Sequence, residues 1–112
     1  MSQIRIGIAG LGVVGAETAR QIIASKDILS KKAGKNLKII AVSARDENKD
    51  RGFSLADIVF YKDPLSLLER DDIDVIIELI GGETGVALNL CKEALRARKH
   101  VITANKAMIA HH

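Results

Sequence analysis

The chain has 112 residues, 47% of them hydrophobic, and a formal net charge of +3 at pH 7. This length suits one domain that buries about two thirds of the surface of its unfolded chain. No apolar stretch is long enough to cross a bilayer, no signal peptide is present, and the basic residues are not interleaved with aromatic ones. Because Cys91 is the single cysteine, no internal disulfide can form. We therefore expect a cytoplasmic protein that binds neither membranes nor nucleic acid.

Strand and helix patterns alternate along the chain. The expected strands, in chain order, cover residues 4–9, 37–43, 58–60, 74–80 and 100–103. A helix is expected from about Val13 past Leu29, where its apolar residues recur on one side. The third strand is short, and we expect it at an edge of the sheet.

Two further helices are expected in the second half. Asp63 and Pro64 begin a short helix, because aspartate caps helices and proline is tolerated at the first helical position. The clearest amphipathic helix follows Gly82, and another helix is expected from Asn105. The apolar face of the amphipathic helix consists of Ala87, Leu90, Cys91, Ala94 and Leu95. The whole order predicts an α/β domain over 1–112, a doubly wound parallel sheet with right-handed crossovers.

Residues 10–15 read Gly-Leu-Gly-Val-Val-Gly and join the first strand to the first helix. In this position the pattern G-x-G-x-x-G predicts a dinucleotide site of the Rossmann type rather than a glycine-rich turn without a ligand. Gly10 would allow the tight turn, Gly12 would leave room for the pyrophosphate, and Gly15 would let the helix pack closely on the sheet. The helix amides would meet the phosphates. The predicted cofactor-binding residues here are Gly10, Leu11, Gly12, Val13, Val14 and Gly15.

The end of the second strand is expected to select the cofactor. Ser43 and Arg45 offer a hydroxyl and a guanidinium, which suit the 2′-phosphate of NADP(H). An enzyme that selects NAD usually offers a carboxylate there, and Asp46 could supply one if the loop were shifted by one or two residues. We expect NADP(H) to be preferred and NAD(H) to be possible. The alternative is that Arg45 is an exposed side chain without a ligand.

The end of the fourth strand carries Glu78 in a stretch that should be dry, so its carboxylate requires partners. It could orient the cofactor or a neighbouring loop, or it could bond the amides of the next helix at the wet end of the strand. Two glycines, Gly81 and Gly82, allow a ligand to approach the backbone. We expect Ile80 and Gly81 to contact the cofactor.

The end of the fifth strand is followed by the candidate catalytic residue. Thr103 is expected to contact the cofactor, and Lys106 could project into the cleft where nicotinamide and substrate meet. Its ammonium could polarise a substrate oxygen or transfer a proton. The alternative is an ordinary surface lysine behind the cap Asn105. The sequence contains no cluster with metal-ligand spacing.

In its motifs at 10–15, 45–46, 78–82 and 103–106, the chain resembles the amino-terminal domain of homoserine dehydrogenase. The resemblance covers essentially all 112 residues. It implies reversible NAD(P)H-dependent reduction of L-aspartate 4-semialdehyde to L-homoserine, on the route to threonine, methionine and isoleucine. It places the family's active-site lysine at Lys106, and the 2′-phosphate contact of NADP-preferring members at Arg45.

The resemblance also implies a longer parent enzyme. The family's acidic catalytic group, second lysine and alkali-metal site belong to a substrate domain that we expect after residue 112. The last strand of the sheet and the dimerisation region are also expected outside these 112 residues. The fragment alone should therefore be inactive, and the parent should be a homo-oligomer. Two other interpretations stay open: a related dehydrogenase of the aspartate dehydrogenase or sugar oxidoreductase type, or a nucleotide-sensing module without chemistry, which should need no lysine in the cleft.

Overall fold

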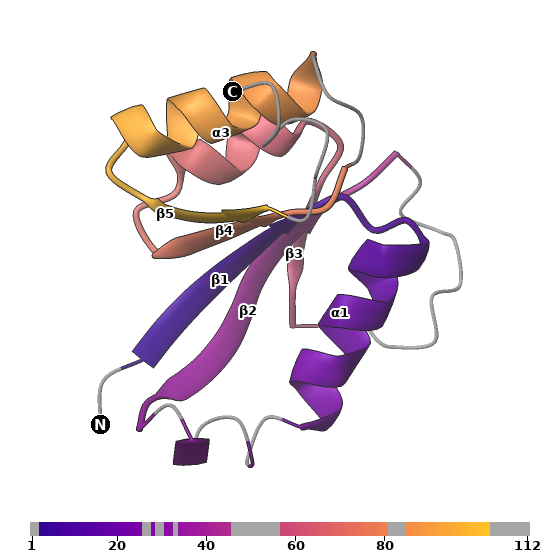
Figure 1. Cartoon of the computed structure of the whole chain (residues 1–112), viewed down its shortest axis with the longest axis vertical. Coiled ribbons are helices and arrows are strands. Elements are labelled where there is room, and N and C mark those ends of the chain that lie inside the picture. Colours follow the sequence, from indigo (N-terminus) through magenta and orange to yellow (C-terminus); the bar gives the residue numbers. More distant parts are fainter. Residues whose placement is uncertain are drawn as a thin grey trace.

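The structure is a computed structural model that describes residues 3–25, 28, 31–32, 34–45, 57–80 and 85–103. Within this part, five parallel strands form one sheet in the order β3-β2-β1-β4-β5. The strands are β1 (Gln3–Ala9), β2 (Asn36–Ser43), β3 (Val59–Tyr61), β4 (Val75–Glu78) and β5 (His100–Thr103). The chain builds the sheet outwards from β1 in both directions (Figure 1). The predicted doubly wound parallel sheet is confirmed.

Helices cover both faces of the sheet. The helix α1 (Val13–Ala24) lies on one face, and α3 (Val86–Arg96) lies on the other together with the 3₁₀-helix η1 (Pro64–Glu69) (Figure 1). Since successive residues of a strand point to opposite faces, Ile8 packs in the cluster beside α1 while Ala9 packs in the cluster beside α3. Burial on both faces explains why the strands read as apolar runs in the sequence.

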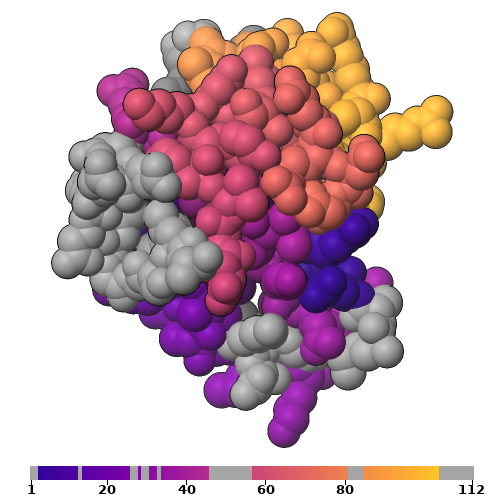
Figure 2. All heavy atoms as spheres, turned by 180° about the vertical axis from the view of Figure 1, so that it is seen from behind, coloured from indigo at the N-terminus to yellow at the C-terminus, as the bar shows by residue number. Residues whose placement is uncertain are grey.

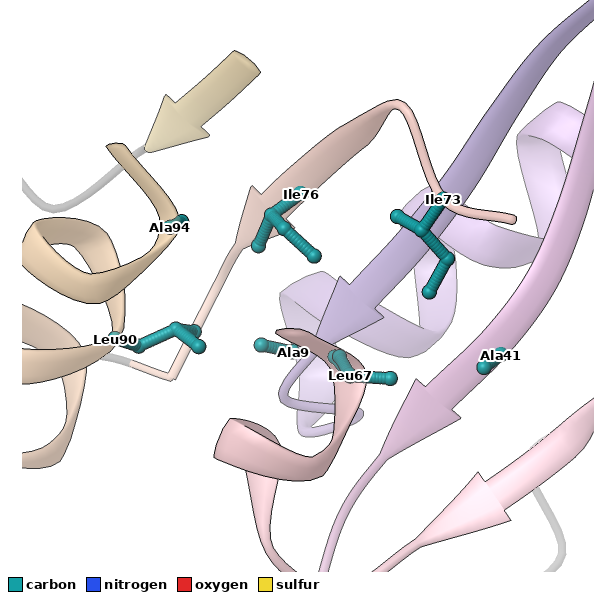
Figure 3. Packing of buried hydrophobic residues seen from close by; sticks show 7 residues of the cluster. All are labelled: Ala9, Ala41, Leu67, Ile73, Ile76, Leu90 and Ala94. Carbon is teal, nitrogen blue, oxygen red and sulfur yellow. The ribbon is translucent and has the colours of Figure 1, made fainter. Parts of the chain in front are cut away.

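The core beside α3 is built from apolar residues of the sheet and of the two helices that cover it. Leu67 of η1 and Leu90 of α3 point towards the sheet, where Ala9 and Ala41 leave room for them (Figure 3). Leu67 is fully buried, and burial of a leucine side chain contributes about 1.5–3 kcal/mol. Figure 2 shows residues 57–80 (pink to salmon) beside α3 and β5 (orange to yellow) on this side of the molecule. The packing of Leu67 therefore stabilises η1, which is too short to be stable by itself.

Two sequence-based expectations are wrong in detail. The first helix does not run unbroken past Leu29: α1 ends at Ala24, and Ser25 forms its C-cap. Ile23 is 44% exposed and Ile28 is 61% exposed, so neither of these described apolar residues anchors a longer helix in the core. By contrast, the expected short helix after Asp63 is confirmed: it is a 3₁₀-helix, and the Asp63 carboxylate accepts the Leu65 N–H at its start.

The second error concerns Leu95, which is 64% exposed although it continues the apolar spacing of α3. No described element covers its side chain. The other four residues of the expected face are buried, so the helix packs through a narrower stripe than its sequence indicates. The helix expected from Asn105 lies outside the described residues.

Candidate cofactor site

The five described strands end in one row. Their register pairs Ala9 with both Ser43 and Glu78, and the row continues to Tyr61 on one side and Thr103 on the other. The direction in which the strands are added reverses between β1 and β4. In open α/β sheets, ligands bind outside the carboxyl ends of the strands at such a reversal. The candidate site is therefore the edge above Ala9 and Glu78.

The loop after β1 is pressed against the loop after β4. The backbone N–H of Gly10 donates to the Ser43 carbonyl oxygen at 2.9 Å, and that of Leu79 donates to the Ala9 carbonyl at 2.9 Å. Gly10 has a φ of 98°, and a Cβ there would lie 2.9 Å from the backbone of Leu79 and Ile80. A side chain at this position would therefore push the two loops apart. Sequence reasoning identified the turn at Gly10 but missed the close approach of the Leu79 and Ile80 backbone to it.

Gly15 is required by the loop itself. A Cβ on Gly15 would collide with the carbonyl oxygen of Gly10, whereas Leu79 Cβ would lie 3.7 Å away. The expected reason, close packing of the helix on the sheet, therefore needs correction, because the severe contact is with the glycine loop. Gly15 of α1 lies against the backbone of Gly10, so only a residue without a side chain fits there.

Gly12 faces open space, since a Cβ there would have no neighbour within 4 Å. It is the N-cap of α1 and supplies no side-chain hydrogen bond, and the first turn of the helix carries no acidic residue. The first amides of a helix normally require such partners. An anionic ligand can take that place, because the helix dipole adds a positive end. The geometry thus fits the pyrophosphate of a dinucleotide.

The remaining residues of the predicted loop divide into buried and exposed ones. Leu11 is 3% exposed and packs with Ile8 and Val42, whereas Val14 is 60% exposed. Val13 is the first residue of α1. Leu11 thus anchors the loop in the core beneath α1, and Val14 lies at the surface in the first turn of α1.

The end of β2 places its two candidates differently. Ser43 is 2% exposed, and its carbonyl oxygen closes the glycine loop through Gly10. Arg45 is exposed. The preceding Ala44 is held to the edge strand, because its N–H donates to the Tyr61 carbonyl at 3.1 Å. The guanidinium is therefore available to a ligand, while the Ser43 side chain is enclosed. Asp46 lies outside the described residues.

Glu78 is fully buried at the end of β4. Its Oε2 accepts the N–H of Ile80 at 2.6 Å, and its Oε1 accepts the Thr103 hydroxyl at 2.6 Å. These contacts support the interpretation that Glu78 orients a neighbouring loop. Ile80 is 37% exposed, so it is available to a ligand. The predicted residues Gly81 and Lys106 lie outside the described residues.

Cys91 is buried in α3. Its burial raises the pKa of the thiol, and the nearby Glu78 carboxylate raises it further. A raised pKa disfavours the nucleophilic thiolate, in agreement with a small core residue. In the part of the chain that the structure describes, no three His, Cys, Asp or Glu side chains come together as metal ligands would. None of the described helices is long and apolar enough to span a membrane.

Comparisons with known proteins agree with this site. The family model described as "Homoserine dehydrogenase, NAD binding domain" matches residues 10–112. The homoserine dehydrogenases of Neisseria gonorrhoeae and Bacillus subtilis are each 36% identical to the chain over 110 residues, 98% of its length. The chain spans 25% of the length of each of these relatives.

Solved structures show the same similarity. A homoserine dehydrogenase structure from Thiobacillus denitrificans has a TM-score of 0.87 and 29% identity, and covers 99% of the chain. The homoserine dehydrogenase structure from S. aureus at pH 7.5 has a TM-score of 0.84 and 30% identity, and covers 96% of the chain. The chain corresponds to 25% of the first structure and 26% of the second.

Proposed function

The chain belongs to the NAD-binding domain family of homoserine dehydrogenases, and from this premise we propose that it is the cofactor-binding part of such an enzyme. The proposed reaction is the reversible reduction of L-aspartate 4-semialdehyde to L-homoserine with NAD(P)H, a step of threonine and methionine biosynthesis. The observation that carries the proposal is the glycine loop, which is open at the start of α1 and braced against the loop after β4. Residues 1–112 form the cofactor domain, and a substrate domain forms the rest of the chain. The complete enzyme is a cytoplasmic homo-oligomer.

Each part of the site has a binding task in this proposal. The amides at the start of α1 hold the pyrophosphate, and Arg45 beyond β2 lies on the side of the adenine ribose. The nicotinamide half then extends towards the ends of β4 and β5, past Ile80 and Thr103. The bound cofactor supplies or accepts the hydride. Lys106 binds the reacting oxygen of the substrate and stabilises the charge that develops there.

Homoserine-dependent reduction of NADP and NAD by the full-length protein that carries this chain tests the proposal. Turnover, followed at the absorbance of the reduced nicotinamide, is the expected result. Lys106→Ala should lower turnover far more than cofactor affinity, because the lysine acts on the substrate oxygen. Retained nucleotide binding without any turnover of homoserine would instead favour a related dehydrogenase or a nucleotide sensor.

We also propose that NADP(H) is the preferred cofactor, because Arg45 is exposed where the 2′-phosphate would lie. Arg45→Ala should weaken NADP binding by about 1.5–3 kcal/mol, the scale of hydrogen bonds to charged groups, and should change NAD binding little. Titration of both nucleotides measures this difference. Lys38→Ala, which removes another exposed cation from the same segment, is the matched control and should leave both affinities unchanged. An equal loss for the two nucleotides in Arg45→Ala would contradict the assignment.

A further inference from the structure

One carboxylate joins two segments that flank the nicotinamide side of the site. Glu78 accepts the Ile80 N–H on one oxygen and the Thr103 hydroxyl on the other, both at 2.6 Å. Ile80 belongs to the loop after β4, and Thr103 is the last residue of β5. In the sequence, Thr103 is separated from Glu78 by 25 residues, so the contact connects parts of the chain that local structure leaves independent.

The contact is built for rigidity. Glu78 is fully buried, so its carboxylate has little freedom to leave its two donors for water. Hydrogen bonds to a carboxylate are shorter and stronger than those between neutral groups. The register sets Glu78 directly opposite Thr103, which holds the two partners together without bending either strand. No described ion pair involves Glu78, so these hydrogen bonds are its described polar contacts.

We propose that Glu78 is a positioning residue for hydride transfer, acting as a clamp that holds the loop after β4 and the end of β5 at a fixed separation. This inference rests on the proposed function. Lys106 follows Thr103 by three positions in the sequence, so the strand end that the clamp holds is the one that leads to the proposed catalytic lysine. The clamp thereby fixes Ile80 and Thr103, the two described residues that border the proposed nicotinamide side of the site.

Thr103→Val tests the clamp in the full-length protein, because it keeps the shape of the side chain and removes the hydroxyl. Small misplacements of reacting groups cost large factors in rate, so kcat for homoserine oxidation should fall by about tenfold or more. The Kd of NADPH should change by a smaller factor than kcat, because Thr103 lies at the nicotinamide end and the pyrophosphate and adenine sites are untouched. Thr103→Ser restores the donor and should recover most of kcat. Ile102→Val, at an exposed position of the same strand, is the control and should match the wild type.

A double-mutant cycle makes the test specific to the pair. Glu78→Gln removes the charge but can still accept the Ile80 N–H, so it should lower kcat by a smaller factor than Thr103→Val. Because both changes disrupt one clamp, the double variant should lose little more than Thr103→Val alone. Losses that multiply, or a kcat that Thr103→Val leaves intact, would overturn the proposal. So would a loss in kcat that Thr103→Ser does not recover.

Hydrogen exchange of the Ile80 amide tests the clamp independently of the proposed reaction. In Thr103→Val the carboxylate loses one of its two anchors, so the Ile80 amide should exchange faster than in the wild type. If the wild type does not oxidise homoserine but this exchange still rises, the reaction assignment fails and the clamp stands. If the wild type is active and the exchange is unchanged, the clamp is wrong.

Discussion

The two ends of the sheet are built from different chemistry. At the amino ends, Asp74 accepts the Arg5 N–H at 2.9 Å and two guanidinium hydrogen bonds at 2.8 and 3.0 Å. Next to it, Lys99 donates to the carbonyl oxygens of Arg70 and Ile73 at 2.8 and 2.9 Å. At the carboxyl ends, the loop after β1 relies on glycines, and α1 begins without a side-chain cap.

The difference separates stability from binding. At the amino ends, the charged side chains of Asp74 and Lys99 form hydrogen bonds with backbone groups next to the strands, so no ligand is needed there. The carboxyl ends leave helix amides open, which disfavours the isolated fold but provides donors for a phosphate. The exception is Glu78, whose buried carboxylate uses its hydrogen bonds to join the loop after β4 to the end of β5. We therefore expect substitutions at the carboxyl ends to change binding and those at the amino ends to change stability.

The largest effect is expected for a pair of glycine variants. Gly15→Ala introduces a methyl group that collides with the Gly10 carbonyl, so it should weaken nucleotide binding by about 100-fold or more and lower stability by about 2–4 kcal/mol. Gly12→Ala meets no neighbour within 4 Å and should leave stability within about 1 kcal/mol of the wild type. It should still weaken binding, because the methyl group occupies the approach of the pyrophosphate. Nucleotide titration and urea unfolding measure the two quantities. Equal stability loss in both variants would break the distinction.

Lys99→Met should give the opposite pattern. It removes two hydrogen bonds to carbonyl oxygens at the amino ends and should lower the free energy of unfolding by about 1–3 kcal/mol. Nucleotide affinity should stay the same, because the ligand binds at the other end of the strands. Lys92→Met, at an exposed position of α3, is the matched control and should change neither quantity. A selective loss of nucleotide affinity in Lys99→Met would show that the two ends are not independent.

The smallest effect is expected for the change in unfolding free energy when the Asp74 carboxylate is protonated at low pH. The Arg5 guanidinium hydrogen-bonds Asp74 and lowers the pKa of that carboxyl to about 2, from an ordinary value near 4. A lowered pKa in the folded state stabilises the fold above pH 4, and this contribution is lost as the pH falls from about 4 towards 2. Asp74→Asn should therefore remove part of the decline in unfolding free energy over this range. The effect is small because both side chains are 36% exposed. Urea unfolding at each pH measures it, and high salt should reduce it. An unaltered acid profile at low salt would contradict the assignment.

Local patterns in the sequence predicted most of the fold. Apolar runs and helical spacing depend on neighbours a few residues apart, so they identified all five described strands and the start of α1. The motif at Gly10, Gly12 and Gly15 also predicted the binding loop, because its glycines are close in the chain. The same motifs indicated the family, and the family model confirmed it. The end of α1 at Ala24 and the exposure of Leu95 escaped these rules, since both depend on which element covers a surface.

The class of the fold, the place of the glycine loop and the family follow from the sequence alone. The tertiary structure was needed for the partners of Glu78, which sequence analysis left open among the cofactor, a neighbouring loop and the amides of the next helix. It also decided that Asp74 joins Arg5, from which it is separated by 69 residues, and that Gly15 faces the Gly10 carbonyl. The physical reason is register. Hydrogen bonds form between atoms within about 3 Å, and strand pairing, rather than separation along the chain, sets which distant atoms meet at that range.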